Sequence, residues 1–178
     1  MPSNWRPPLS VSEKATIEEL RFVFDQATKR AEQTSEEGDR LYNKSINIIV
    51  VCLPLLSALI GYIISHFSLN ALTILASLSA IVLLIVVSVL KNSVMPTRYL
   101  GSGSYPKDLL TESFYENLNN KTTEWYFIMN ETIMYQERIE INVQNNTDRN
   151  SRLKDCFMFL YSLPLLLILA SVMLYFFS

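Results

Sequence analysis

Charged side chains are absent from two long stretches of this chain. No Lys, Arg, Asp or Glu occurs from Ser45 to Leu90 or from Cys156 to Ser178, and apolar residues fill both stretches. A charge at the centre of a bilayer costs at least ~2.5 kcal/mol, so long charge-free apolar runs indicate segments embedded in lipid. A helix of about 20 apolar residues spans the hydrocarbon core. The pattern therefore predicts three transmembrane helices, over residues 46–67, 69–90 and 156–177.

The charged segment before the first span, residues 12–44, is predicted to form one amphipathic helix. Ser10 to Glu13 has the spacing of a capping box, in which a hydroxyl and a carboxylate satisfy the first backbone donors of a helix. Apolar or small residues then recur every three or four positions, the repeat of a heptad seam that packs on a partner helix. This seam comprises Ile17, Leu20, Phe24, Ala27, Ala31, Thr34, Gly38 and Leu41.

A second long helix is predicted over residues 107–155, because this range contains neither Gly nor Pro. Its stripe repeats in the same way, through Leu110, Phe114, Leu118, Lys121, Trp125, Ile128, Thr132, Tyr135, Ile139 and Asn142. Several Asn residues then precede the third span, which lies within residues 156–178. Asn is a weak helix former, so this part predicts either a break or the lining of a wet space.

The positive charges predict how the chain is oriented. All 15 Lys and Arg residues lie outside the spans, and none lies in the turn of residues 66–70 inside the transmembrane hairpin of residues 45–90. Cytoplasmic segments carry the excess of Lys and Arg, so we expect residues 1–44 and 91–155 in the cytoplasm and the C-terminus outside.

The expected fold class is an all-α integral membrane protein with three transmembrane helices and a long cytoplasmic helical stalk. Two long amphipathic helices in one chain cannot bury all of their seam residues against each other. Further copies of the chain can cover the rest, and most homo-oligomers have closed symmetry. We therefore expect a homo-oligomer, for example a tetramer, in the bacterial inner membrane.

The residues offer little chemistry for catalysis or coupled transport. The single histidine, His66, lies in the external turn, and the chain has no Cys-x-x-Cys, phosphate-binding loop or Gly-x-Ser-x-Gly motif. The acidic residues alternate with Lys and Arg along helix surfaces, as solvated faces do. Ion-coupled carriers usually place an ionisable group inside the membrane, and these spans have none. We expect no enzyme, metal site or cofactor.

A pore is compatible with the polar residues of the spans. Thr73, Ser77 and Ser88 share one helical face and could line a narrow conduit. The alternative is that small residues such as Ser57 and Gly61 only allow close helix packing.

Two Leu-Pro-Leu-Leu motifs suggest a pair of matched hinges. Pro54 lies ten positions after Lys44, and Pro164 lies ten positions after Lys154. Proline removes a backbone hydrogen bond and favours a kink at its own depth in the membrane. The alternative is coincidence, since membrane helices tolerate proline.

The loop of residues 91–106 is locally basic and rich in Gly and Pro, which allows two interpretations. It can simply turn the chain, with Lys91 at the lipid headgroups. It can also bind an anion, because glycine backbone N–H groups, a helix start and cations attract phosphate and tyrosines stack on bases. The candidates are Arg98, Tyr99, Gly101, Gly103, Tyr105 and Lys107, with Arg138, Arg149 and Arg152 as alternative contacts.

The N-terminal tail, residues 1–11, is too rich in proline for a helix. Trp5 and Arg6 form an amphipathic pair within it. The tail is therefore either a loose terminus that touches headgroups or a plug or latch at the cytoplasmic mouth.

The layout resembles that of small bacterial anti-phage membrane effectors. A cytoplasmic helix, a tight hairpin, a loop with Pro96, Gly101 and Pro106 and a long return helix are similar to SLATT-like proteins over residues 12–140. The third span departs from that pattern and is more similar to the channel-type effector of the Hailong system, which is paired with a nucleotidyltransferase. The resemblance implies a gated pore that depolarises the inner membrane under control of a nucleotide or a DNA or RNA oligonucleotide. The alternatives are a non-conducting scaffold that tethers a cytoplasmic partner, and a holin-like lytic protein.

Overall fold

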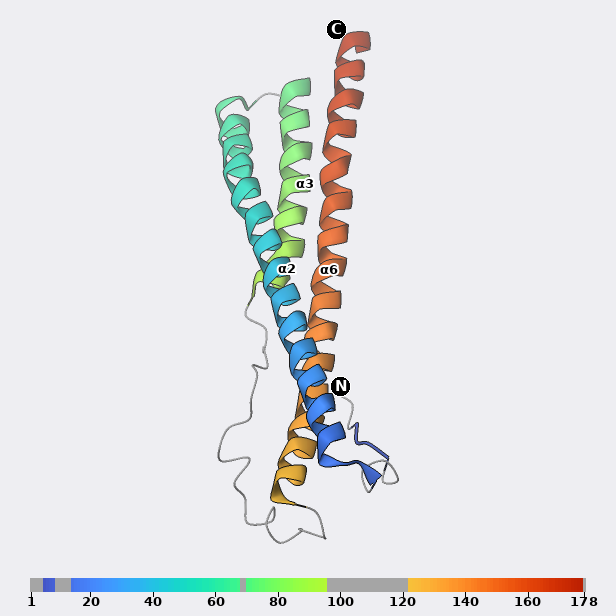
Figure 1. Cartoon of the computed structure of the whole chain (residues 1–178). Coiled ribbons are helices and arrows are strands. Elements are labelled where there is room, and N and C mark those ends of the chain that lie inside the picture. The colour runs from blue at the N-terminus through green and yellow to red at the C-terminus, as the bar shows by residue number, and fades with distance from the viewer. Residues whose placement is uncertain (1–4, 9–13, 68–69, 96–121, 178) are drawn as a thin grey trace. The chain divides into compact units, whose positions relative to one another are not determined.

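The computed structural model describes residues 5–8, 14–67, 70–95 and 122–177. They form three helices, α2 (Ile17–Ser65), α3 (Ala71–Val94) and α6 (Thr123–Phe177), as Figure 1 shows. All three are long and apolar enough to cross a membrane. The prediction of an all-helical chain with three possible spans is therefore confirmed, and the chain fits a multi-pass membrane protein.

A capping box starts α2 at Thr16 and Glu19. The carboxylate of Glu19 accepts from the backbone N–H of Thr16 at 2.9 Å, and the Thr16 hydroxyl accepts from the Glu19 N–H at 3.3 Å. These reciprocal bonds satisfy backbone donors that the helix itself leaves open. The capping box predicted at residues 10–13 lies outside the described residues, and α2 begins at Ile17.

Helix α2 ends at Ser65 and α3 begins at Ala71, and residues 68–69 of the predicted turn lie outside the described residues. Asn70 is the N-cap of α3, and its side-chain oxygen accepts from the backbone N–H of Thr73 at 2.8 Å. On the α2 side, the rings of Tyr62 and His66 stack with centroids 4.5 Å apart. An Asn N-cap is among the strongest helix starts, so α3 begins directly after Asn70.

Helix α6 continues through the Asn-rich segment without a break. It begins at Thr123. The hydroxyl of the preceding residue, Thr122, accepts a hydrogen bond from the backbone N–H of Trp125 at 3.3 Å. The helix then runs on through Pro164, and α2 likewise contains Pro54. The break that weak helix propensity allowed near residue 145 does not occur. The predicted start of this helix at residue 107 lies outside the described residues.

The chain divides into two compact units. The first comprises Met1–Asp39 and Thr97–Asn146, and the second comprises Arg40–Pro96 and Thr147–Ser178. Helices α2 and α6 contribute residues to both units, whereas α3 belongs to the second.

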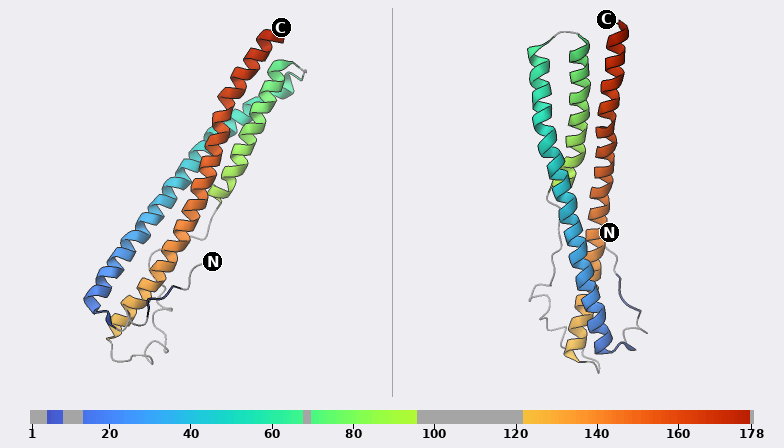
Figure 2. Two further views of the ribbon diagram at one scale, coloured as in Figure 1. Left: turned by 90° about the vertical axis from the view of Figure 1, so that its right-hand side faces the viewer. Right: turned by 45° about the horizontal axis from the view of Figure 1, so that its top comes forward.

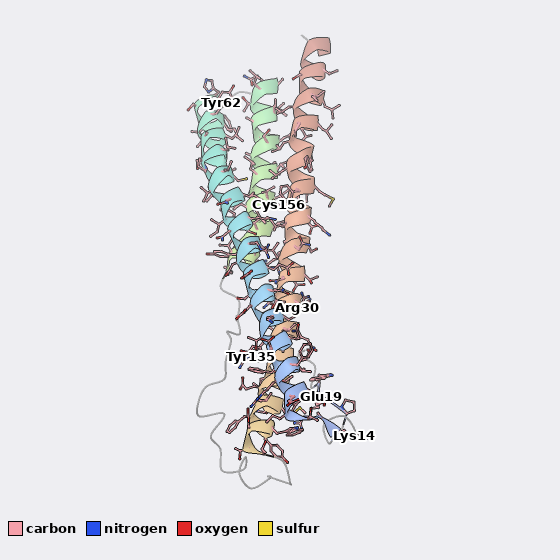
Figure 3. All side chains as sticks on the ribbon, viewed as in Figure 1. Lys14, Glu19, Arg30, Tyr62, Tyr135 and Cys156 are labelled. Atoms are coloured by element: carbon pink, nitrogen blue, oxygen red, sulfur yellow. The ribbon has the colours of Figure 1, made fainter. Side chains whose placement is uncertain are left out.

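The second unit packs α2, α3 and α6 side by side around one apolar core (Figures 1 and 2). Within this unit α2 and α6 run in the same direction and α3 runs in the opposite one. Val86, Leu90 and Cys156 are completely buried there, and Figure 3 labels Cys156. The whole core cluster is Leu41, Cys52, Leu83, Val86, Leu90, Leu153 and Cys156.

Large apolar side chains also cover the outer faces of the spans. Ile64 is 72% exposed and Leu84 is 55% exposed, although both lie in the charge-free stretch from Ser45 to Leu90. A surface of this kind is unfavourable in water and favourable in lipid or against another apolar helix.

We expect the core of the second unit to depend on its buried leucines more than on its outer ones. Leu90→Ala leaves a cavity at a fully buried position and should lower the free energy of unfolding by about 2 kcal/mol or more. Leu84→Ala on the same helix removes an exposed side chain and should change it by less than about 0.5 kcal/mol. Melting temperatures in a neutral detergent would show the difference, and equal losses would contradict the packing described.

Candidate functional site

Helices α2 and α6 run parallel in the first unit. The indole N–H of Trp125 donates to the backbone carbonyl of Ala15 at 3.0 Å, across 110 positions of sequence. Farther along, the side-chain N–H of Asn146 donates to the carbonyl of Thr34 at 2.7 Å, across 112 positions. Both members of these pairs rise together in number, so the two helices point the same way.

Aromatic rings fill the middle of this helix pair. Phe24 of α2 meets Tyr135 of α6 edge to face, with ring centroids 5.5 Å apart. The guanidinium of Arg138 lies 5.1 Å from the centre of the same Tyr135 ring, which Figure 3 labels. An arginine over an aromatic face is attracted by the ring and can lay its aliphatic stem on it. Tyr135 therefore connects an apolar contact with a buried cation.

Next along the pair is a group of buried polar side chains, which we call the polar layer. It consists of Thr34 on α2 and Arg138, Asn142 and Asn146 on α6, all between 1% and 7% exposed. The Oδ1 atoms of Asn142 and Asn146 are buried without a hydrogen-bond partner. A buried acceptor that loses its partners in water costs about 1–3 kcal/mol. The polar layer thus weakens the pairing compared with an apolar seam.

Small residues on α2 bring its backbone close to the polar layer. Ala31, Thr34 and Gly38 are all buried on the face that carries the contact to Asn146. The Thr34 hydroxyl donates to the carbonyl of Ala31 at 2.9 Å, so it is satisfied within its own helix. An Asn amide can reach a helix backbone only where side chains on that face are short. The polar layer therefore selects one register of α2 against α6.

The observed seam of α6 differs from the predicted stripe at Ile128, which is half-buried, and most clearly at Ile139. The stripe included Ile139, whereas the structure buries Arg138 and leaves Ile139 half-buried. One residue corresponds to about 100° around a helix, so in this one turn a different side chain faces the partner, while Tyr135 and Asn142 on either side are buried as predicted. Hydropathy alone predicts that Ile139 is buried. Arg138 is buried instead, because its guanidinium is attracted to the ring of Tyr135.

Among the predicted anion-binding residues, those in the loop lie outside the described residues: Arg98, Tyr99, Gly101, Gly103, Tyr105 and Lys107. The alternative contacts fall in separate units. Arg138 belongs to the first unit, and Arg149, 5% exposed, belongs to the second. Arg152 is half-buried in the second unit and donates from a guanidinium nitrogen to the carbonyl of Asn92 at 3.2 Å. It thereby places a cation on the carbonyl end of α3, a favourable position for it.

The predicted pore-lining residues do not share one environment in the single chain. Thr73 is buried, Ser77 is half-buried and Ser88 is exposed. The Ser77 hydroxyl donates to the carbonyl of Thr73 at 2.8 Å, so it is satisfied within its own helix. The predicted hinges, Pro54 and Pro164, are exposed and sit inside continuous helices. Both roles stay predictions.

The predicted gate residues lie beside the start of α2. Trp5, 42% exposed, lines a groove of about 990 Å³ together with Pro7 and Pro8. Helix α2 contributes Leu20, Phe22 and Val23 to the same groove, and α6 contributes Met129 and Thr132. Arg6 is exposed. Whether this segment acts as a plug or latch stays a prediction.

The described side chains hold no group of three or more His, Cys, Asp or Glu that could bind a metal ion. Comparisons of the chain with models of known families, with curated proteins and with solved structures found no match. The candidate site is therefore the polar layer. The sequence indicated it only by the Asn residues near the end of the stripe predicted over residues 107–155.

We expect the polar layer to be replaceable by apolar side chains with a gain in stability. Asn142→Leu removes a buried acceptor without a partner and should raise the free energy of unfolding by about 1–3 kcal/mol. Asn150→Leu, at an exposed position of the same helix, is the matched control for the gain in helix propensity. Thermal unfolding in detergent measures both, and a lower melting temperature for Asn142→Leu than for the control would contradict a buried Asn142 Oδ1 without a partner.

The capping box predicts a loss of helix stability in acid. The backbone N–H and then the hydroxyl of Thr16 hold the pKa of Glu19 below its usual 4.5. Because the folded pKa is lowered, the stabilisation is present above the ordinary pKa and is lost as the pH falls through the folded pKa.

Glu19→Gln should therefore flatten this response below pH 4.5, whereas Glu18→Gln in the same first turn should keep it. Melting temperatures of both variants and the parent chain, at neutral pH and below 4.5, provide the test. An unchanged acid response in Glu19→Gln would exclude Glu19 as its source.

Proposed function

We propose that the chain is a gated, pore-forming membrane effector that acts as a homo-oligomer in the bacterial inner membrane. In this proposal the first unit is the cytoplasmic stalk and senses a signal. The second unit supplies the spans, and the response is permeabilisation or depolarisation of the membrane. The role is non-enzymatic and needs no cofactor.

The observation that carries the proposal is the continuity of α2 and α6. Each helix contains residues of the polar layer and a span with no interruption, over 49 and 55 residues respectively. A helix is stiff along its axis, so a change of rotation or register at Thr34 and Asn146 would be carried along both spans. Because the Oδ1 atoms of Asn142 and Asn146 have no hydrogen-bond partner, the present pairing is not the most stable one that two helices could form. Such a pair suits a two-state element.

Open small-residue surface on α2 supports assembly. Ser57, Gly61 and Ser65 are exposed at four-residue spacing, and a Cβ added at Gly61 would meet nothing within 4 Å. Helices in lipid associate through such surfaces because their backbones can approach closely. Ser88 is likewise exposed on α3, where a pore between copies would need a hydroxyl.

The signal in this proposal is a nucleotide or oligonucleotide made by a partner nucleotidyltransferase. The support is the layout shared with SLATT-like and Hailong-type effectors and the cations and glycines of residues 91–107. Phosphate binds where backbone N–H groups and cations converge. Arg149 and Arg152 offer further cations on α6 just before the predicted third span.

A non-conducting scaffold is the second candidate, and the groove at Trp5 favours it. Phe22 is 66% exposed and Val23 is 46% exposed on the wall of that groove, outside the predicted spans. Exposed apolar residues in a water-facing part of a protein commonly mark a contact with another protein. A scaffold would hold a cytoplasmic partner there and would conduct no ions.

Ion flux through purified protein in liposomes tests the proposal. We expect flux that depends on the polar layer, because Asn142→Leu stabilises one pairing and should reduce gating, while Asn150→Leu should conduct as the parent chain does. Candidate nucleotides are added to both. Absence of flux in every condition, together with a stoichiometric protein partner that is lost in Phe22→Ser, would replace the pore by the scaffold.

A further inference from the structure

The charges of the chain are divided unequally between its two units. The second unit contains six basic residues and two acidic ones, Asp148 and Asp155, which gives it a formal charge of 6 − 2 = +4. The whole chain carries −2, so the first unit carries −2 − 4 = −6. The small net charge of the chain is therefore the sum of a positive second unit, which contains the charge-free stretches, and a negative first unit.

The basic residues of the second unit come from three separate helices that meet at one end. Leu41 of α2, Leu90 of α3 and Leu153 of α6 belong to one core cluster. A lysine lies three positions after the first of these leucines and directly after each of the other two. The bond from Arg152 to the carbonyl of Asn92 joins α6 to α3 at the same end. Parallel α2 and α6 with an antiparallel α3 thus bring three distant segments together (Figure 1).

The three lysines, Lys44, Lys91 and Lys154, form what we call the lysine collar. All three are exposed, and none forms a salt bridge with another described residue. Asp155 follows Lys154 directly, and neighbours in sequence do not face each other on a helix. Each lysine lies within two residues of a charge-free stretch. If the charge-free stretches span the bilayer, the lysine collar lies at the boundary between the hydrocarbon core and the lipid headgroups.

We propose that the lysine collar binds the phosphate of anionic phospholipids, such as phosphatidylglycerol, in the leaflet that faces the first unit. The lipid tails then lie on exposed apolar residues of the adjoining spans, among them Leu84 and Val51. A lysine near an anionic membrane surface contributes about five-fold in affinity, and this attraction falls within a Debye length. The partner is a lipid and not a soluble anion because the cations border the apolar surface that the tails need.

The proposal does not depend on conduction, so its test measures binding. Native mass spectrometry of the full chain, released from micelles that contain phosphatidylglycerol and phosphatidylcholine, counts the lipids that stay bound. We expect the parent chain to retain phosphatidylglycerol in preference. The Lys44→Gln, Lys91→Gln, Lys154→Gln variant should lose this preference by more than about ten-fold, given about five-fold for each lysine.

The matched control removes three positive charges from the first unit, by Lys14→Gln, Lys29→Gln and Arg30→Gln. It changes the net charge equally and should keep the lipid preference. Equal loss in both variants, or no loss in the collar variant, would overturn the proposal. Since the collar lysines are exposed, folding should persist; Lys91→Gln against Lys14→Gln gives the same comparison should the triple variant fail to fold.

Competition with a free anion identifies the source of the phosphate. Millimolar glycerol phosphate should leave the bound phosphatidylglycerol in place, because it has no tails to rest on the spans. Complete displacement would show a site for the phosphate group alone and would overturn the assignment to a lipid. Raising the salt concentration should weaken retention in the parent chain and have little effect on the collar variant.

Discussion

The energetic cost of placing a charge in hydrocarbon organises this protein. Because no ionic side chain lies between Ser45 and Leu90 or after Cys156, the three helices that contain these stretches can enter lipid there, and every charged side chain lies outside these stretches. The packing follows from that partition. With α2 and α6 parallel and α3 returning between them in sequence, three boundaries between apolar and charged segments coincide at one end of the second unit. The lysine collar is a consequence of topology as much as of composition.

The two units differ in the residues through which their helices pack. In the second unit the helices meet through Val86, Leu90 and Cys156, all completely buried. In the first unit the same α2 and α6 meet through Tyr135, Arg138 and two Asn side chains. Apolar packing is stable but tolerates several registers, whereas a buried amide favours one register at a cost in stability. A helix pair with its polar contacts at one end can change there without losing its apolar core.

The sequence predicted the spans and most of the α2 seam, and it failed where polar residues decide the packing. Leu20, Ala31 and Leu41 were expected inside and are buried, because small and apolar residues at heptad spacing have one favourable face. Arg138 was not expected inside, since its burial depends on the ring of Tyr135, three residues away, and no hydropathy pattern contains that contact. The helix start at Thr16 and Glu19 has the same capping spacing as residues 10–13, and local spacing alone does not rank two such motifs.

The division of charge also constrains where an anionic signal can act. An anion that approaches the first unit meets a region with a net charge of −6, while the second unit presents +4 beside the membrane. Electrostatic potential of this kind directs charged ligands over distances of a Debye length or more. If the signal is a nucleotide, as proposed, it would be drawn toward the part of α6 that precedes the predicted span, where Arg149 and Arg152 lie, and would compete there with lipid phosphates. Lipid and signal would then act on the same short segment of α6, between the polar layer and the span, so that the composition of the membrane would set the threshold at which a signal changes the helix pair.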